Sequence, residues 1–149
     1  MSEEKGNYTG SCLCGQVQYQ VSEFLPVIAH CHCTMCQKFH GAAFSTFAEV
    51  EKEHLHWLSG QEHLTSYRAE NGSIRQFCNC CGASMAFISR YNEEASTVEI
   101  AIATLDSGAP LTPDAHIFTR SQVPWITLCD DLPRFSGFRT PIPADEDHS

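Results

Sequence analysis

The sequence is poor in basic residues. It contains 9 lysines and arginines against 18 aspartates and glutamates, which gives a formal net charge of -9 at pH 7. Nucleic-acid binding needs a basic face that contacts the phosphates, so this balance argues against nucleic acid as a partner. It also argues against binding to anionic membrane surfaces.

Long hydrophobic runs are absent as well. No segment is long and apolar enough to span a membrane, and the sequence begins MSEEKGN, without the apolar run of a signal peptide. We therefore expect a cytoplasmic protein with no membrane partner. In the reducing cytoplasm its cysteines would remain thiols, which favours metal binding over disulfides.

The sequence also lacks an internal repeat, a linker and any long stretch with the 3.6-residue period of a helix. Hydrophobic residues make up 42% of the 149 residues and charged residues 18%, which is the composition of a globular protein. We expect a single domain over residues 1–149 with little helix, a core at about 8–138 and frayed ends.

Short hydrophobic stretches separated by turn signals indicate a mainly β fold. In residues 16–21 (QVQYQV) apolar residues alternate with glutamines, as they do in a half-buried strand. Asn71-Gly72 is a strong signal for a hairpin between 64–69 and 74–77. Further strands are predicted at 26–30, 44–50, 55–58, 85–88, 97–105, 116–118 and 125–128. Such a pattern is typical of a sandwich, a barrel or a folded sheet.

Cysteine, in contrast, is abundant, with nine residues. An odd number fits a pure disulfide framework poorly, whereas thiolates are preferred ligands of zinc. Seven of the nine lie in three short groups, each expected on a turn between strands. The groups are a C-x-C at Cys12 and Cys14, a C-x-C-x-x-C at Cys31, Cys33 and Cys36, and a C-x-x-C at Cys78 and Cys81.

The simplest division of these seven cysteines gives one four-thiolate site and one three-thiolate site. Cys12 and Cys14 with Cys78 and Cys81 would join two distant hairpins, which suits a closed structural zinc. The glycines that follow these two pairs suit the positive-φ turns that point the sulfurs inward. The spacing leaves other divisions open, because the cysteines of 31–36 can exchange roles with either pair.

Several residues near the groups have more than one interpretation. Cys80 and Cys129 lie outside the groups, and we expect ordinary buried or surface thiols there. Cys80 lies within the Cys78–Cys81 span and is an alternative ligand, although C-x-x-C is the usual chelating spacing and adjacent cysteines chelate poorly. His32 lies between two candidate ligands, where it is a fourth ligand, a proton shuttle or a packed turn histidine. His30 and His40 flank the loop and are alternative ligands that would close the site.

Three segments together resemble the glutathione-dependent formaldehyde-activating enzyme family, which includes the centromere protein V proteins. They are residues 10–17 (GSCLCGQV), 31–38 (CHCTMCQK) and 77–82 (FCNCCG), and the cysteine groups occur in the family's order. The resemblance covers about 8–138.

The end of the chain extends this resemblance. Residues 116–118, Trp125 and 131–135 are similar to the family's C-terminal part. The chain departs from the family at Gln37, where members often have arginine. If that arginine helps to hold an anionic thiol, its replacement weakens the case for glutathione itself as the substrate.

The resemblance implies a zinc-bearing fold of twisted antiparallel sheets, the β-tent type. It also implies two zinc ions per chain, one of them structural and the other near a glutathione site. The structural zinc would be held by Cys12, Cys14, Cys78 and Cys81, and the second by Cys31, Cys33 and Cys36.

The expected chemistry follows from the charge of the second site. Zinc with three thiolate ligands is electron-rich and therefore a poor Lewis acid for polarising a carbonyl. It is better suited to binding a substrate thiol as its thiolate. Our first functional hypothesis is a zinc-dependent carbon–sulfur lyase. It acts on an adduct of a small thiol with an aldehyde, such as that of glutathione with formaldehyde. Lys38 and Arg75 are the candidate cations that offset the charge.

The second functional hypothesis is a non-catalytic, zinc-stabilised module that binds a protein partner. In that case both metals are structural. Basic low-complexity extensions would favour a chromatin module, and the sequence has none. We therefore favour the enzyme.

Overall fold

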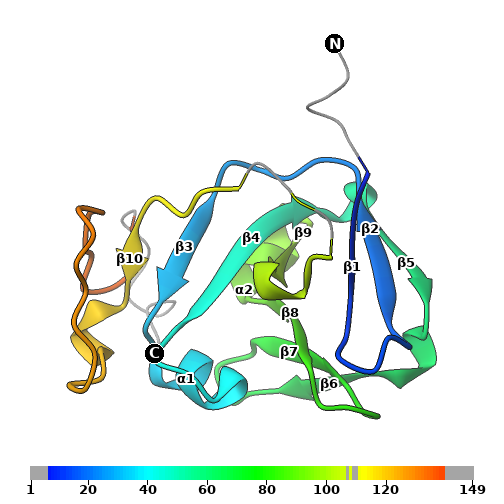
Figure 1. The fold of residues 1–149 in the computed structure, drawn as a ribbon, viewed down its shortest axis with the longest axis horizontal. Helices are drawn as coiled ribbons and strands as arrows, with labels where there is room; N and C mark the ends of the chain where they lie inside the picture. The colour runs from blue at the N-terminus through cyan, green and yellow to red at the C-terminus, as the bar shows by residue number, and fades with distance from the viewer. Residues whose placement is uncertain (1–6, 107, 109–110, 140–149) are drawn as a thin grey trace. The chain divides into compact units, whose positions relative to one another are not determined.

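The computed structural model describes residues 7–106, 108 and 111–139. Over these residues the chain is mainly β, with ten strands, two short α-helices and a few 3-10 helices (Figure 1). The predicted fold class, mainly β with little helix, is confirmed. None of the helices in this part of the chain has the length and apolar character needed to cross a bilayer.

The strands are β1 (Tyr8–Ser11), β2 (Gln18–Val21), β3 (Ile28–Cys31), β4 (Ser45–Glu51), β5 (Leu55–Ser59), β6 (Leu64–Arg68), β7 (Ile74–Cys78), β8 (Ser84–Ile88), β9 (Thr97–Ala101) and β10 (His116–Ile117). The α-helices are α1 (Thr34–His40) and α2 (Arg90–Ala95). The 3-10 helices are η2 (Lys52–His54), η3 (Gln61–His63), η4 (Ile102–Thr104) and η5 (Thr119–Ser121).

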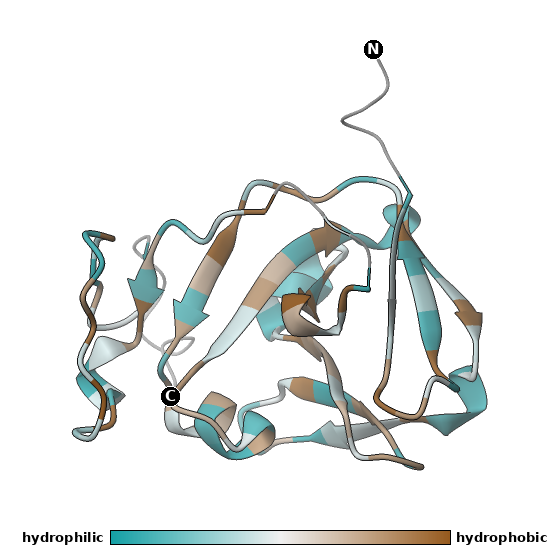
Figure 2. Ribbon diagram, viewed as in Figure 1, coloured by the Kyte–Doolittle hydropathy of each residue, from teal (hydrophilic) through white to brown (hydrophobic). Residues whose placement is uncertain are grey.

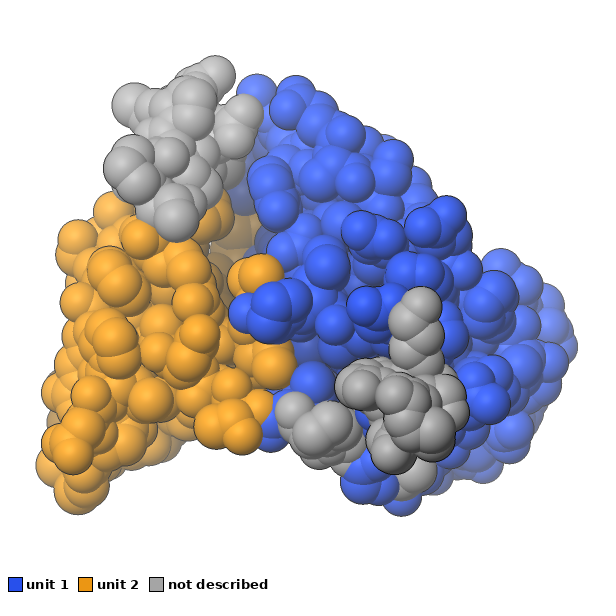
Figure 3. Space-filling view, turned by 90° about the horizontal axis from the view of Figure 1, so that it is seen from above, with its two compact units in different colours: residues 1–26, 48–111 blue, residues 27–47, 112–149 orange. Residues whose placement is uncertain are grey.

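The chain divides into two compact units, coloured separately in Figure 3. Unit 1 comprises Met1–Pro26 and Ala48–Leu111, and unit 2 comprises Val27–Phe47 and Thr112–Ser149. Each is described by itself below. The single-domain organisation remains a prediction.

Unit 1 contains two sets of antiparallel strands. In the first set β2 pairs with β1 on one side and with β5 on the other. In the second set β6, β7, β8 and β9 pair in chain order. The predicted hairpin is confirmed, because β6 and β7 are in register from Leu64 opposite Cys78 to Arg68 opposite Ile74. Its turn contains Gly72 with a φ of 90°.

A single hydrophobic cluster forms the core of unit 1, and it includes two of the grouped cysteines. Along β2 the side chain of Tyr19 is buried and that of Gln18 is exposed, so the period-two pattern is confirmed. Figure 2 shows hydrophobic and hydrophilic residues mixed along the strands, as expected for sheets with one buried face. The buried members of the cluster are Cys12, Val17, Tyr19, Val21, Val50, Cys78, Met85, Ala86, Val98 and Ile100.

Unit 2 is built around β3 and the helix that follows it. β3 pairs in parallel with β10, with His30 opposite His116 and Cys31 opposite Ile117. Helix α1 begins after Cys33, whose sulfur accepts a hydrogen bond from the Cys36 N–H. The two-residue loop between strand and helix therefore keeps the candidate ligands close together.

The structure differs from the sequence expectations at several elements. Strand β1 and both α-helices were not predicted, so the group at 31–36 is a strand end and helix start rather than a turn between strands. The strand expected at 97–105 ends at Ala101 and continues as η4. Residues 125–128 form no strand, and Trp125 is 71% exposed. Pro124 directly before Trp125 cannot donate a hydrogen bond to a neighbouring strand.

Candidate metal centres

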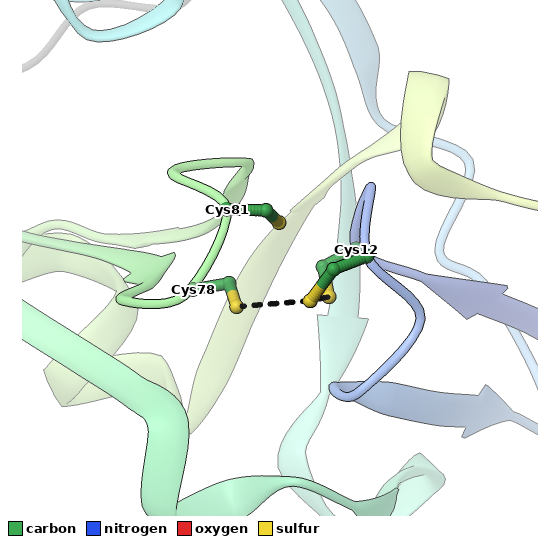
Figure 4. Close-up of side chains that lie close together, drawn as sticks. Cys12, Cys78 and Cys81 are labelled. Atoms are coloured by element: carbon green, nitrogen blue, oxygen red, sulfur yellow. Dashed lines mark hydrogen bonds between the residues drawn. The ribbon is translucent and has the colours of Figure 1, made fainter.

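Unit 1 brings four cysteines from two distant loops together. Cys12 and Cys14 lie on the loop between β1 and β2, and Cys78 and Cys81 lie on the turn between β7 and β8. In Figure 4 the side chains of Cys12, Cys78 and Cys81 extend toward a common centre. The four sulfurs all lie within 4.8 Å of one another.

The spacing of these sulfurs fits a zinc ion. With a zinc–sulfur bond of about 2.3 Å, tetrahedral geometry requires sulfurs about 3.8 Å apart. The Cys12 and Cys14 sulfurs are 3.6 Å apart, and those of Cys14 and Cys78 are 4.0 Å apart. Four thiols at this spacing form no disulfide, so the donor set is that of a closed four-thiolate site.

Backbone N–H groups support the charge that such thiolates carry. The Val17 N–H donates to the Cys12 sulfur at 3.3 Å, and the Cys80 N–H donates to the Cys78 sulfur at 3.4 Å. Although burial opposes it, hydrogen bonds from the backbone of Ala83 and Cys14 help to lower the pKa of Cys81 to about 6. Such donors orient thiolate ligands and stabilise them.

The thiols also compete with one another for ionisation. A backbone hydrogen bond from Gln16 lowers the pKa of Cys14, but burial and the three neighbouring thiols outweigh it and raise the pKa to about 12. Four adjacent thiolates therefore need a cation among them, which is the condition that a bound zinc ion meets.

Unit 2 brings three cysteines together. Cys31 ends β3, Cys33 precedes α1, and Cys36 lies in its first turn. All three are buried, and their sulfurs lie within 4.8 Å of one another. Hydrogen bonds with Cys33 and Cys36, together with burial, raise the pKa of Cys31 well above its usual range. These three thiols likewise fit a cation that takes up the charge of their ionised forms.

Among the described residues this group has three members. No histidine or carboxylate has a ligand atom within 4.8 Å of all three sulfurs. His32 is therefore not a fourth ligand in this structure, and neither is His30 or His40. His32 is fully buried, and its Nε2 lies 2.9 Å from Nδ1 of His116. Burial, followed by the charge of His116, lowers the pKa of His32 to about 4.

The two candidate cations lie in different units. Lys38 is an exposed residue of α1 in unit 2. Arg75 is a buried residue of β7 in unit 1, and its guanidinium carbon lies 4.5 Å from the centre of the Phe87 ring. Their role near the three-cysteine group stays a prediction.

Gln37, which directly follows the third cysteine of the loop, has an internal role. Its Nε2 donates to the carbonyl of His32 at 2.7 Å and to that of Ser121 at 2.9 Å. Both amide hydrogens are therefore used within unit 2, where they join the cysteine loop to the segment after β10.

The two remaining cysteines are exposed thiols outside both groups. Cys80 lies 3.3 Å from Nδ1 of His63, and Cys129 lies next to Asp130. Sequence reasoning did not identify His116 as the partner of His32, or Asp130 as the partner of His116. Only the pairing of β3 with β10 brings His116 beside the cysteine loop, and no local pattern signals it.

Two of three comparisons relate the chain to known proteins. A search of curated proteins finds no match. A solved structure of a Rhodobacter sphaeroides protein, a structural-genomics target, is similar, with a TM-score of 0.57 and 26% sequence identity. The similarity covers 68% of this chain and 91% of that chain. The profile of one family, described as glutathione-dependent formaldehyde-activating enzyme, matches residues 7–121, which is most of the sequence. The chain therefore belongs to the glutathione-dependent formaldehyde-activating enzyme family.

Proposed function

We propose that this protein is a carbon–sulfur lyase that acts on the adduct of a small thiol with an aldehyde, such as S-hydroxymethylglutathione. The observation that carries the proposal is the three-cysteine group of unit 2, which offers three ligand atoms where a closed site needs four. Membership of a family named for glutathione and formaldehyde supports the choice of thiol and aldehyde.

We assign Cys31, Cys33 and Cys36 as the residues that would hold a zinc ion at the reacting site. Cys12, Cys14, Cys78 and Cys81 would hold a second, structural zinc. A zinc ion held by these three thiolates would supply an open coordination position for a substrate thiol and would keep that thiol ionised at neutral pH. Thiolate ligands of this kind require a reducing compartment, so we also propose a cytoplasmic location.

The protein's own residues keep the thiols in place. The N–H of Cys36 donates to the Cys33 sulfur at 3.3 Å, which fixes that sulfur at the start of α1. The Gln37 amide holds the carbonyl of His32, between two of the ligands. We assign Lys38, an exposed residue of α1, the task of offsetting negative charge near the substrate, whereas such a role for Arg75, a residue of unit 1, stays a prediction.

The proposed reaction is balanced without an oxidant or a reductant. The carbon–sulfur bond of the adduct breaks, and its electron pair stays on sulfur. The hydroxyl of the adduct loses its proton to water, and its oxygen forms the carbonyl of the aldehyde. The reverse reaction joins a thiolate to formaldehyde.

The test measures exchange between free formaldehyde and its glutathione adduct, using ¹³C-labelled formaldehyde and NMR magnetisation transfer. Zinc-loaded protein should accelerate the exchange above the uncatalysed rate, and Cys33→Ser should lose the acceleration. Cys129→Ser is the matched control, because it removes an exposed thiol outside both groups. A protein with both sites loaded and no acceleration would favour the non-catalytic module instead.

A further inference from the structure

A chain of hydrogen bonds runs through unit 2 from its surface to the cysteine loop. Oδ2 of Asp130 lies 2.9 Å from Nε2 of His116. Nδ1 of His116 lies 2.9 Å from Nε2 of His32. Asp130 is partly exposed, whereas His116 is 1% exposed and His32 is fully buried. These hydrogen bonds therefore connect a surface carboxylate to His32, the residue between Cys31 and Cys33.

The chemistry of these groups sets the direction of each hydrogen bond. An ionised carboxylate only accepts, so the hydrogen of His116 is on Nε2. The hydrogen bond from His116 lowers the pKa of Asp130, which keeps the carboxyl ionised. A neutral imidazole carries one N–H, so Nδ1 of His116 must accept. The Nε2–H of His32 is then the donor, and Nδ1 of His32 carries no hydrogen.

His32 faces away from the sulfurs of the loop. Successive side chains of an extended strand point to opposite sides, which places His30 and His32 together and opposite Cys31 and Cys33. The rings confirm that His30 and His32 share one side, because both contact the ring of His116, with centroids 4.8 and 5.1 Å apart. Neither histidine has a nitrogen within 4.8 Å of all three sulfurs. His32 therefore acts on the cysteine group through the main chain.

The rest of His32 is also held in place. Its N–H donates to the carbonyl of Ile117 at 3.0 Å, and its own carbonyl accepts from Gln37. Within the part of the chain that the structure describes, only its Nδ1 has no hydrogen-bond partner. The ring position and the tautomer thus depend on His116.

We propose that Asp130 and His116 are positioning residues for the three-cysteine group. They hold His32 in the Nε2–H tautomer and in one orientation, and they thereby fix the main chain that carries Cys31 and Cys33. The inference rests on the proposed function in that it takes this group as the reacting site.

One substitution reverses the donor and acceptor roles along the hydrogen bonds from Asp130 to His32 without removing these bonds. Oδ1 of Asp130 accepts from the Leu132 N–H at 3.1 Å, and an asparagine that keeps this bond places its NH₂ where Oδ2 was. The retained Oδ1 also lies 3.2 Å from Nε2 of His116, but the group in the place of Oδ2 is nearer, at 2.9 Å. Because this nearer NH₂ donates to Nε2, His116 carries its hydrogen on Nδ1 and donates to His32. In Asp130→Asn the hydrogen of His32 therefore moves to Nδ1. Asp131→Asn is the matched control, because it changes the adjacent exposed carboxylate.

Long-range ¹H–¹⁵N NMR of the zinc-loaded full chain tests the tautomers. The spectrum is recorded at pH 8, above the ordinary imidazole pKa of about 6.5. We expect Nε2–H on both His32 and His116 in the native protein and in Asp131→Asn, and Nδ1–H on both in Asp130→Asn. An Nδ1–H form of His32 or a doubly protonated His116 in the native protein overturns the proposal. Unchanged tautomers in Asp130→Asn do so as well.

Chelator competition tests the effect on the metal. Loss of outer-shell partners typically weakens metal binding about 10- to 100-fold. We expect Asp130→Asn to weaken zinc binding about tenfold at the three-cysteine group. The binding step of this group is identified as the one that is missing from the titration of Cys33→Ser. The binding step of the four-cysteine group should stay unchanged. An unchanged three-cysteine step overturns the positioning role. Neither measurement uses turnover, so failure of the lyase proposal would be seen separately, in the exchange assay alone.

Discussion

A glycine follows each cysteine pair of the four-cysteine group, and both glycines have a left-handed backbone. The φ of Gly15 is 86° and that of Gly82 is 81°. A Cβ added to either would meet nothing within 4 Å, so space is not the constraint. The turn itself requires the left-handed conformation. Only in this conformation do the backbone N–H groups after the glycine point at the cysteine sulfurs.

Two glycine substitutions separate the energetic cost of a strained backbone from that of a steric collision. Gly82→Ala should lower the free energy of unfolding by about 1–2 kcal/mol, the cost of a left-handed residue with a side chain. Gly60→Ala should cost clearly more, because Gly60 has a φ of 74° and an added Cβ would also collide with the Gln16 carbonyl. Urea unfolding of the metal-loaded proteins measures both, with Gly108→Ala as a control in open space. Equal losses for Gly60→Ala and Gly82→Ala would contradict the collision.

Tyr19 makes stability depend on alkaline pH. Burial in the core of unit 1 raises the pKa of Tyr19 to about 12, and its hydroxyl lies 2.6 Å from that of Thr104. The unfolded chain loses this proton near pH 10, whereas the folded chain keeps it up to about pH 12. The contribution of Tyr19 is therefore complete below pH 10 and falls as the pH rises to 12, by up to about 3 kcal/mol.

Tyr19→Phe should make this fall shallower. The variant should also lose about 1 kcal/mol at pH 8, because the hydrogen bond to Thr104 is removed. Urea unfolding between pH 8 and 11.5 measures both effects. Tyr67→Phe is the control, because Tyr67 is 61% exposed. An alkaline slope that stays the same in Tyr19→Phe would show that other groups cause it.

At the scale of the elements, strands were easier to predict from sequence than helices. The alternation in β2 and the Asn71-Gly72 turn are local patterns, and the structure confirms both. Helices α1 and α2 have 7 and 6 residues, too few for a 3.6-residue period to show. Their caps are also unusual, since a cysteine caps α1 and the capping box of α2 pairs Ser89 with Asn92.

The same contrast applies to the candidate site. The C-x-C and C-x-x-C spacings are local, so the three groups could be predicted from the sequence alone. The proximity of Cys12 and Cys78 depends on the packing of two sheets. The cysteine spacing alone did not determine which groups share a metal site, and only the family resemblance implied this pairing. The chain from His32 to Asp130 depends on a strand pair of two residues, His116 and Ile117, which is too short to leave a pattern.

At the scale of the whole molecule, the two cysteine groups differ in how they relate to folding. Cys12 and Cys78 belong to the core cluster of unit 1. The four-cysteine group joins two loops that are far apart in sequence, since 64 positions separate Cys14 from Cys78. Metal bound there closes a long loop and neutralises buried thiols, so its binding free energy is largely folding free energy. The three-cysteine group spans residues 31–36 and closes only a short loop.

This difference predicts opposite outcomes for two variants with the same chemical change. The native protein should contain about two zinc ions per chain. Cys33→Ser should keep about one and give a well-dispersed NMR spectrum, because the four-cysteine group still holds the core of unit 1. Cys78→Ser should be insoluble or molten, because it leaves buried thiols without the cation that they need. Metal analysis with ¹H–¹⁵N spectra decides between these outcomes. If Cys78→Ser folded normally with both metals bound, the four-cysteine assignment would be wrong.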